Sequence, residues 1–203
     1  MKSIAKVLFG AVLGAAFALW IIKERVQWLS SLTFTLEAPP VPLSVLASIR
    51  EAEDVSYAGR SPLRRLGEAG QDILVFASPE LAYRLNSSVG RYRIKAQTIE
   101  AILPWAIDEG YLVLDDIPED AFAHALAYFS EQPALNDWQA AVYLAWLRSE
   151  HAGLAAVSWP DIAADPELVA KLYSGYMGAG GAWDAWRADL VPGPVARRRL
   201  GLN

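Results

Sequence analysis

The hydrophobic and polar residues of this 203-residue chain follow mainly the spacing of α-helices. We expect helices at residues 43–54, 79–86, 95–109, 118–131, 134–150, 165–177 and 181–189. Two short apolar runs, DILVFAS and YLVLDD, are the best strand candidates, although neither has a clear hairpin partner. The pattern therefore predicts a mainly α protein, with one domain over residues 43–203.

The chain opens with an uncharged apolar stretch, residues 7–22, between Lys6 and Lys23. As a helix this stretch would be roughly 24 Å long, slightly less than the ~30 Å hydrocarbon core of a membrane. Lysines at both ends can reach the membrane surfaces and so compensate for the difference. We interpret residues 1–25 as a single-pass transmembrane anchor. A cleavable signal peptide is the alternative, because residues 16–18 (AFA) resemble a cleavage site.

The segment EAPPVP, residues 37–42, has the composition of a stiff extended linker. We therefore expect residues 26–42 to connect the anchor to the domain. Within the anchor, Gly10, Gly14 and Ala18 are spaced four residues apart, which lets two membrane helices approach closely. This spacing is compatible with a homo- or hetero-oligomer formed through the membrane helix.

The composition excludes several classes of function. Hydrophobic residues make up 54% of the chain and charged residues 20%, which predicts a folded protein. The net charge is −5, and the only dense basic run is residues 197–199, so we expect no nucleic-acid partner. Because the chain has no cysteine, disulfides, thiolate catalysis and cysteine metal sites are excluded. The two histidines, His124 and His151, are not spaced as a zinc pair, and we expect no metal and no cofactor.

Residues 176–186, YMGAGGAWDAW, combine three glycines with two tryptophans. A dinucleotide-binding loop is excluded, since these glycines follow a helical pattern and Trp183 occupies the position of the third glycine. We predict instead a glycine turn between two helices. Trp183 and Trp186 are three residues apart on one face of the second helix. They belong either to the core or to a surface that stacks on sugar rings, whose apolar C–H faces suit indole.

Four segments, in chain order, resemble the motifs of soluble lytic transglycosylases, which are lysozyme-like helical enzymes that act on peptidoglycan. The last segment, YMGAGGAWDAW, resembles their Tyr-Asn-Ala-Gly-Pro-Gly…Trp signature, with Met177 where asparagine is usual. The third segment, NDWQAAVYLAWL, resembles the family's Asn-x-x-x-Gly-x-x-Tyr-Leu helix, with looser spacing. The second segment, SSVGRYRIKAQT, resembles the family's Gly-Leu-Met-Gln-Ile-x-Pro-x-Thr segment, with Arg93 in place of the glutamine. The matching residues are Tyr176, Gly181 and Trp186, then Asn136, Tyr143 and Leu144, then Gly90, Ile94 and Thr98.

The first segment, VLASIREAED, resembles the helix that ends in that family's catalytic glutamate. Helix geometry distinguishes its glutamates: Leu46, Ile49 and Glu53 lie along one stripe. Glu51 lies about 200° around the helix from Ile49, so we expect Glu53 to be buried and Glu51 to be exposed. Burial of a carboxyl without a charge partner favours its protonated form, which a general acid needs.

The resemblance implies that Glu53 protonates the glycosidic oxygen and then acts as a base while the sugar's own 6-hydroxyl attacks. A second catalytic carboxylate would then be unnecessary. The substrate-binding residues that the resemblance implies are Gly90, Arg93, Tyr143, Tyr176, Gly181 and Trp186. We expect Glu53, Gly90, Tyr176 and Gly181 to border one groove between helices, with Tyr143 on a central helix behind it. The alternative for Glu53 is an ordinary helix-end carboxylate that pairs with Arg64 or Arg93.

A second resemblance leads to the same glycan. REAEDVSY is similar to the Glu-Asp-x-x-Phe motif of the peptidoglycan glycosyltransferase domains of penicillin-binding proteins, which also follow an amino-terminal membrane helix. The histidine and the Ser-Thr-Ile-Thr-Gln segment expected there are absent. We therefore expect a transglycosylase of the bacterial inner membrane, with its domain in the periplasm and with glycan strands and membrane lipid as partners. The alternatives are a glycosyltransferase-like domain, an inactive glycan-binding protein or a membrane-assembly protein.

Overall fold

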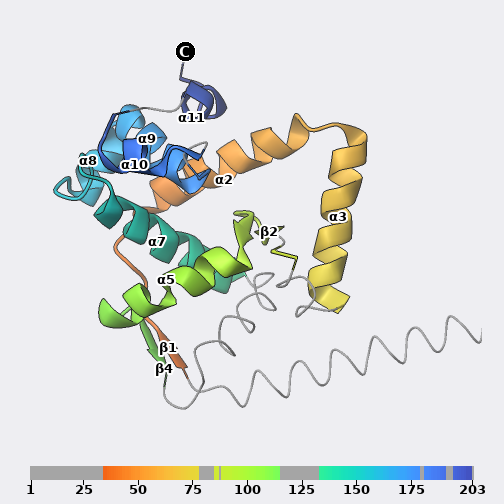
Figure 1. Cartoon of the computed structure of the whole chain (residues 1–203), viewed down its shortest axis with the longest axis horizontal. Coiled ribbons are helices and arrows are strands. Elements are labelled where there is room, and N and C mark those ends of the chain that lie inside the picture. Colours follow the sequence, from red (N-terminus) through yellow and green to blue (C-terminus); the bar gives the residue numbers. More distant parts are fainter. Residues whose placement is uncertain are drawn as a thin grey trace, which may run out of the picture.

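The computed structural model describes residues 34–77, 85–86, 88–114, 133–178, 181–190 and 194–202, and this part of the chain is mainly helical (Figure 1). Its longer helices are α2 (Leu43–Ala58), α3 (Pro62–Ala77), α5 (Ala96–Asp108), α7 (Pro133–Glu150) and α9 (Pro166–Tyr176). The shorter helices of the described part are α8 (Trp159–Ala164), α10 (Trp183–Arg187) and α11 (Pro194–Arg199). The prediction of a mainly α protein is therefore confirmed.

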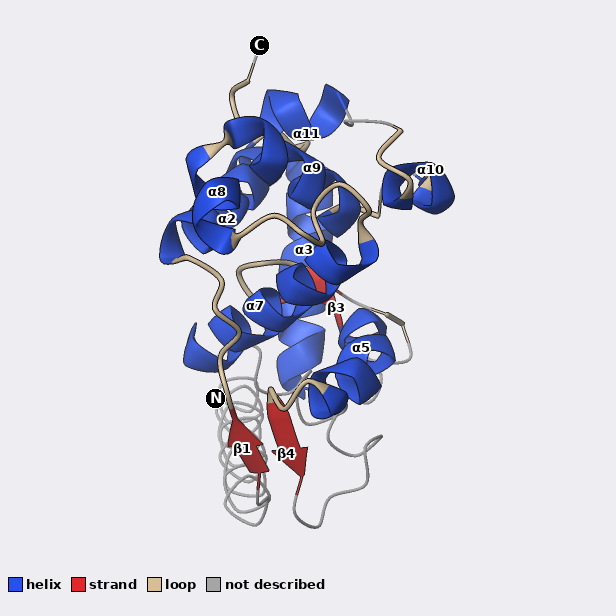
Figure 2. Cartoon of the chain, turned by 90° about the vertical axis from the view of Figure 1, so that its left-hand side faces the viewer, coloured by secondary structure: helices blue, strands red, loops and turns tan. Residues whose placement is uncertain are grey.

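Two small antiparallel sheets accompany the helices in the described part of the chain. Strand β1 (Phe34–Leu36) pairs with β4 (Leu112–Leu114), and Thr35 lies opposite Val113. Strand β2 (Ser88–Val89) forms a hairpin with β3 (Ile94–Lys95), directly before α5. In Figure 2, the β1–β4 sheet lies at the end of the molecule away from α11. The strand expected in YLVLDD is thus present, and its partner comes from the segment that was expected to be linker.

Part of the expected linker belongs to the folded domain. Besides the pairing of β1, both Pro39 and Val41 are buried, and the Trp138 indole donates a hydrogen bond to the Glu37 carbonyl at 3.0 Å. Proline suits an extended segment that packs on a surface as well as it suits a free linker, because proline needs no backbone hydrogen-bond partner. The segment at residues 34–41 therefore packs with the folded domain and is not a free linker.

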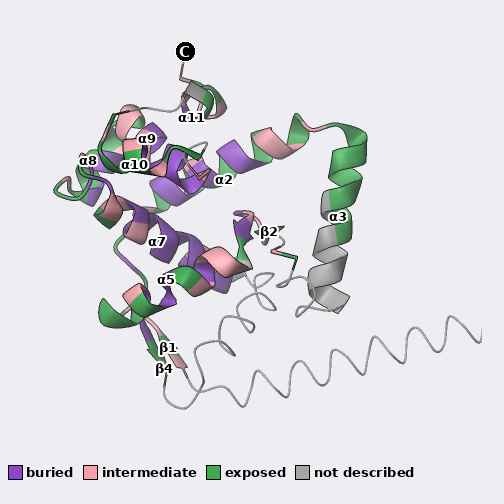
Figure 3. Cartoon of the chain, in the orientation of Figure 1, coloured by how far each residue is buried: buried purple, intermediate pink, exposed green. Residues whose placement is uncertain are grey.

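Helix α7 forms the centre of the core. Its residues 140–145 are all buried, as is Leu147, so the helix is enclosed on every side. Helices α2, α5 and α9 pack around it. In Figure 3, the buried residues concentrate in α7, α9 and the adjoining half of α2. This arrangement holds the inner faces of α2 and α9 at fixed positions beside α7.

Helix α2 runs out of the core towards α3, which stands apart from the other described helices (Figure 1). The run DILVFAS, residues 72–78, was expected to be a strand, and this prediction is wrong, because residues 62–77 are helical. A short apolar run fits a strand and a buried helix equally well by periodicity alone. The first residues of α3, such as Leu63 and Leu66, are largely exposed.

Most of the remaining helix predictions agree with the structure. Helices α5, α7, α9 and α10 begin and end within two residues of the expected bounds, and α2 extends beyond residue 54 to Ala58. The expected helices at 79–86 and 118–131, and the expected anchor at 1–25, lie wholly or mostly outside the described residues. Among the helices of the described part, none has the length and hydropathy needed to span a membrane. The two described glycines of the turn predicted after α9, Gly178 and Gly181, have φ values of 79° and 85°, in the region that favours glycine.

Candidate functional site

Glu53 is buried on α2, as the helical stripe predicted, with 7% of its surface exposed. Glu51, on the opposite face, is exposed. The Tyr173 hydroxyl, on α9, donates a hydrogen bond of 2.7 Å to Oε1 of Glu53. The same Oε1 lies 3.6 Å from the guanidinium of Arg199, at the end of α11. The expectation of a carboxyl without a charge partner is therefore wrong, and Arg199 is a charge partner that was not expected.

A continuous row of aromatic rings starts at Glu53. Tyr173 is followed by Tyr176 at a centroid separation of 6.0 Å, and Tyr176 by Tyr143 at 5.1 Å. The row then continues through Trp146, 5.9 Å from Tyr143, to Trp183, 6.0 Å further. Tyr143 and Trp146 are three residues apart and so share a face of α7. We call Tyr143, Trp146, Tyr176 and Trp183 the aromatic wall.

The β2–β3 hairpin closes the side of the site that faces α2. The Tyr176 hydroxyl donates a hydrogen bond to the carbonyl of Tyr92 in this hairpin. The guanidinium of Arg93 lies 5.1 Å from the ring centroid of Tyr57 on α2, a cation–π distance. Arg93 also has a φ of 54°, in the left-handed region that non-glycine residues seldom occupy. The hairpin therefore ties α9 to α2 across the site.

Gly90 positions this hairpin against α7. Its φ is 67°, and a Cβ atom added there would lie 2.3 Å from Nδ2 of Asn136. Asn136 is buried, and its Oδ1 accepts a hydrogen bond of 2.9 Å from the backbone N–H of Arg91. Two segments that resembled the transglycosylase motifs thus meet through Gly90 and Asn136. This geometry indicates that Gly90 allows the hairpin backbone to approach α7 closely.

We predict that Gly90→Ala lowers the free energy of unfolding by roughly 2–4 kcal/mol, because it combines left-handed strain with disruption of the buried Asn136 hydrogen bond. Gly110→Ala is a matched control. Gly110 has a φ of 77° but nothing within 4 Å of an added Cβ, so only the strain of about 1–2 kcal/mol should appear. Denaturant unfolding of both variants measures the difference, and equal losses would contradict a specific role for the Asn136 contact.

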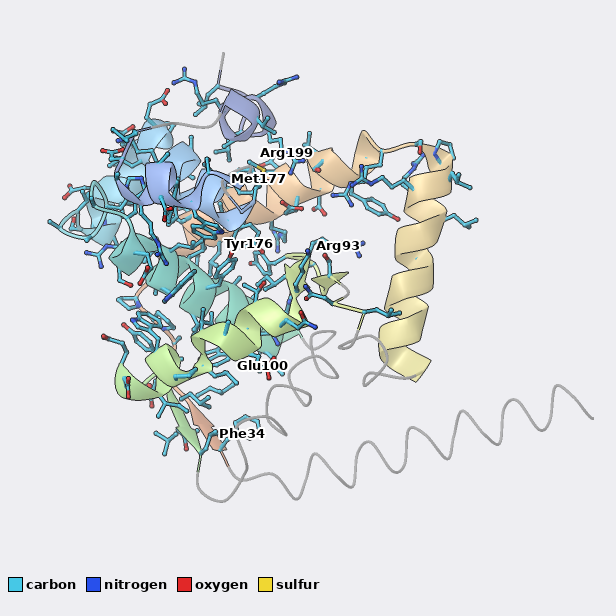
Figure 4. All side chains as sticks on the ribbon, in the orientation of Figure 1. Phe34, Arg93, Glu100, Tyr176, Met177 and Arg199 are labelled. Carbon is cyan, nitrogen blue, oxygen red and sulfur yellow. The ribbon has the colours of Figure 1, made fainter. Side chains whose placement is uncertain are left out.

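These elements enclose a cavity of about 710 Å³, the central cavity, within the size range of small-ligand sites. Among the predicted site residues, the cavity is lined by Glu53, Arg93, Tyr143 and Tyr176. Figure 4 shows Tyr176, Met177 and Arg93 grouped between α2 and α5, with Arg199 beside α2. The elements that bring these side chains together are α2, α7, α9 and the hairpin.

Three predicted binding residues lie outside the lining of the central cavity. Trp186 is only 1% exposed, and its indole donates a hydrogen bond of 2.8 Å to the Lys171 carbonyl. Trp186 is therefore a core residue of the α9–α10 packing and does not line the central cavity. Gly181 has a φ of 85° and serves the turn before α10, and Gly90 serves the hairpin as described.

The lining also contains residues that were not predicted to bind substrate. They include Trp146, Arg60, Arg64, Lys95 and Arg199. Trp183, for which the sequence left open either the core or a sugar-stacking surface, also lines the cavity. Trp146 could have been found, since it follows Tyr143 by one helical turn and lies on the same face. Arg199 could not, because its proximity to Glu53 depends on the packing of α11 beside α2 and α9.

Burial keeps the tyrosine hydroxyls of the site protonated. It raises the pKa of Tyr143, and burial together with the nearby negative charge of Glu53 raises the pKa of Tyr173 and Tyr176. Burial and the Asp137 carboxylate raise the pKa of Tyr92 to about 12. Tyr173 therefore remains a hydrogen-bond donor to Glu53 over the whole physiological pH range.

Among the described residues, the site can thus offer one buried carboxylate, that of Glu53, at the end of a row of aromatic faces. It can also offer polar lining groups, among them Gln97 and Thr98 at the start of α5. Within the described ranges, no group of three or more histidine, aspartate or glutamate side chains is placed to hold a metal ion. Comparisons of the chain with protein-family models, with curated proteins and with solved structures find no match.

Proposed function

We propose that this protein is a membrane-anchored transglycosylase that cleaves the glycan strands of peptidoglycan, with Glu53 as the catalytic residue. The observation that carries the proposal is the convergence of Glu53 and the aromatic wall on the central cavity. Aromatic faces suit the apolar C–H faces of sugar rings, and a partly buried carboxyl can exchange a proton with a glycosidic oxygen. A lysozyme-like helical domain on an amino-terminal membrane helix remains part of this proposal.

The contacts between distant segments support the same function. The four segments that resembled transglycosylase motifs meet in space: Glu53 contacts Tyr173, three residues before Tyr176, and Tyr176 bonds to the hairpin and packs on Tyr143. Asn136 contacts the hairpin beside Gly90. Order along the chain and adjacency in space are independent observations, so the adjacency adds weight to the resemblance.

In the proposed reaction, Glu53 gives its proton to the glycosidic oxygen as the bond between that oxygen and C1 breaks. The carboxylate then removes the proton of the sugar's 6-hydroxyl while the oxygen of that hydroxyl bonds to C1, and an anhydro ring results. Tyr173 and Arg199, on Oε1, stabilise the carboxylate formed between the two steps. Glu53 regains its proton in the second step, so no second carboxylate is required.

A second candidate is a glycan-binding protein that does not cleave. It is favoured by the engagement of Oε1 of Glu53 with both Tyr173 and Arg199, an arrangement that also suits a purely structural carboxylate. Met177 lines the cavity where the resembled family has asparagine, which removes one hydrogen-bonding group. The aromatic wall would bind sugars in either case.

Incubation of the purified full-length protein with peptidoglycan sacculi tests both candidates. We expect soluble muropeptides that end in an anhydro sugar, detected by mass spectrometry. Sedimentation of the protein with sacculi in the absence of products would favour the glycan binder. The absence of both products and sedimentation would exclude both candidates and would favour the membrane-assembly alternative.

A further inference from the structure

His151 is a buried histidine whose two ring nitrogens have different surroundings. It is 1% exposed and directly follows Glu150, the last residue of α7. The backbone N–H of Gly153 donates a hydrogen bond of 3.0 Å to Nδ1 of His151. Nδ1 is therefore the unprotonated nitrogen, and the ring is neutral with its proton on Nε2. Among the described residues, the buried Nε2 has no hydrogen-bond partner.

Charged groups surround His151 from α7, α9 and α10. Nε2 lies 3.7 Å from Oδ1 of Asp189, two residues after α10, and this carboxylate binds the ammonium group of Lys171, on α9, at 2.9 Å. Next to His151 in the chain, Glu150 forms an ion pair of 2.6 Å with Arg187 and so joins α7 to α10. Burial lowers the pKa of His151 below its ordinary value of 6.5; Lys171 acts in the same direction, and Asp189 opposes it.

A second proton on His151 conflicts with the turn that follows α7. The proton would occupy Nδ1 and face the N–H of Gly153, and two donors cannot hydrogen-bond to each other. The turn has no room to move towards Asp189, because a Cβ atom added at Gly153 would lie 2.2 Å from Oδ2 of that residue. Protonation therefore requires the turn at residues 151–153 to change its contacts with the end of α10.

Two further contacts tie this turn to α10 and to the cavity. The backbone N–H of Ala152 donates a hydrogen bond of 2.9 Å to the Arg187 carbonyl, and the ring of His151 packs edge-on against Trp186, 4.7 Å away. Trp186 packs edge-on against Trp183 at 5.2 Å. Trp183 is the last ring of the aromatic wall and lines the central cavity. Helix α10 therefore connects His151 to the cavity.

We propose that His151 is a pH-sensitive switch: in its neutral form it holds α10, and with it Trp183, at the central cavity, and its protonation in mildly acidic solution releases α10. The effect on ligand binding rests on the proposed function, whereas the movement of α10 does not. The pKa of His151 is lower in the folded than in the unfolded chain, so the stabilisation is fully present above about pH 6.5 and is lost as the pH falls below that value. In that range the unfolding equilibrium constant should rise by up to about 10-fold for each pH unit.

Proton NMR of the full-length protein in detergent, between about pH 8 and about pH 5, follows the switch, because the chain has only two histidines. The indole N–H signal of Trp183, assigned by its absence in Trp183→Phe, should shift with the same midpoint as the His151 ring signals. The affinity for an N-acetylglucosamine hexamer, whose charge does not change with pH, is measured over the same range. We expect this affinity to fall by about 5- to 30-fold on acidification, as the contact with Trp183 is lost.

His151→Asn should abolish both changes, because the asparagine Oδ1 takes the place of Nδ1 as acceptor for Gly153 and the side chain does not ionise. His124→Asn, which removes the other histidine, is the matched control and should keep both changes. Lys171→Gln removes the nearby cation and should raise the midpoint, whereas Asp189→Asn removes the carboxylate and should lower it. Asparagine tolerates the φ of 59° at position 189. These opposite shifts test the proposal even if His151→Asn does not fold.

A Trp183 signal that did not move with the titration of His151 would overturn the switch, as would the same pH dependence in wild type and His151→Asn. An affinity of wild type for the hexamer that stayed constant while His151 titrated would also overturn it, and would leave the proposed function standing. If the hexamer bound at no pH while the Trp183 signal still followed His151, the switch would stand and the proposed function would lose its glycan ligand.

Discussion

Glu53→Gln is expected to lower turnover on peptidoglycan by roughly 10²- to 10⁴-fold, the usual loss when a general acid–base group is removed. Glutamine keeps the size of the side chain and can still accept the Tyr173 hydrogen bond, but it has no proton to transfer. Release of anhydro muropeptides from sacculi, followed over time, measures the effect. Binding to sacculi should be retained, since the cavity keeps its shape and its aromatic wall.

Glu51→Gln is the control for this substitution, because it makes the same chemical change two residues away on the exposed face of α2. It should alter neither turnover nor stability measurably. Glu53→Gln loses the charge contact with Arg199, so its free energy of unfolding should fall by about 1–2 kcal/mol. Equal turnover of wild type and both variants would remove Glu53 from the mechanism, whatever the cavity binds.

The position of Glu53 illustrates what helical periodicity can predict. The stripe of Leu46, Ile49 and Glu53 predicted an inward-facing carboxyl, and all three side chains are buried. Periodicity describes one helix face and does not indicate which groups will cover it. Tyr173 and Arg199 come from helices more than a hundred residues later, so the expected absence of a charge partner could not be tested on the sequence.

The wrong predictions in the fold have the same origin. Strand β1 was assigned to the linker because its partner, β4, lies far along the chain and leaves no hairpin signal in the sequence. The second half of α3 was assigned to a strand because a short apolar run has no distinguishing period. In each case the local pattern was compatible with two structures, and a contact distant in sequence decided between them.

The aromatic wall was only half predictable for a related reason. Tyr143 and Tyr176 were identified from motif order, whereas the choice between Trp183 and Trp186 depended on α9. The indole of Trp186 packs directly against Gly175, where an added Cβ would lie 2.3 Å from its ring. Trp186 fills the space that Gly175 leaves on α9 and is therefore fully enclosed, whereas Trp183 lies at the central cavity.

Trp186→Ala is expected to lower the free energy of unfolding by about 3–5 kcal/mol, the range for removing a large aromatic side chain from a core. The substitution leaves a cavity against Gly175, deprives the Lys171 carbonyl of its indole donor and removes the ring that packs edge-on against His151. Denaturant unfolding measures the loss. Any decrease in glycan binding should follow from the smaller folded fraction rather than from a lost contact.

Trp183→Ala is the matched substitution, three residues earlier on the same short helix. Trp183 is half-buried and lines the central cavity, so its loss should lower the free energy of unfolding by only about 1–2 kcal/mol. Affinity for glycan should fall by about 5- to 30-fold in the folded variant, because an aromatic face that stacks on sugar contributes on the order of 1–2 kcal/mol. Stability and binding thus separate the two tryptophans. If Trp183→Ala bound glycan as well as wild type did, the sugar-binding role of this end of the aromatic wall would be lost, and the row of rings would be a packing feature alone.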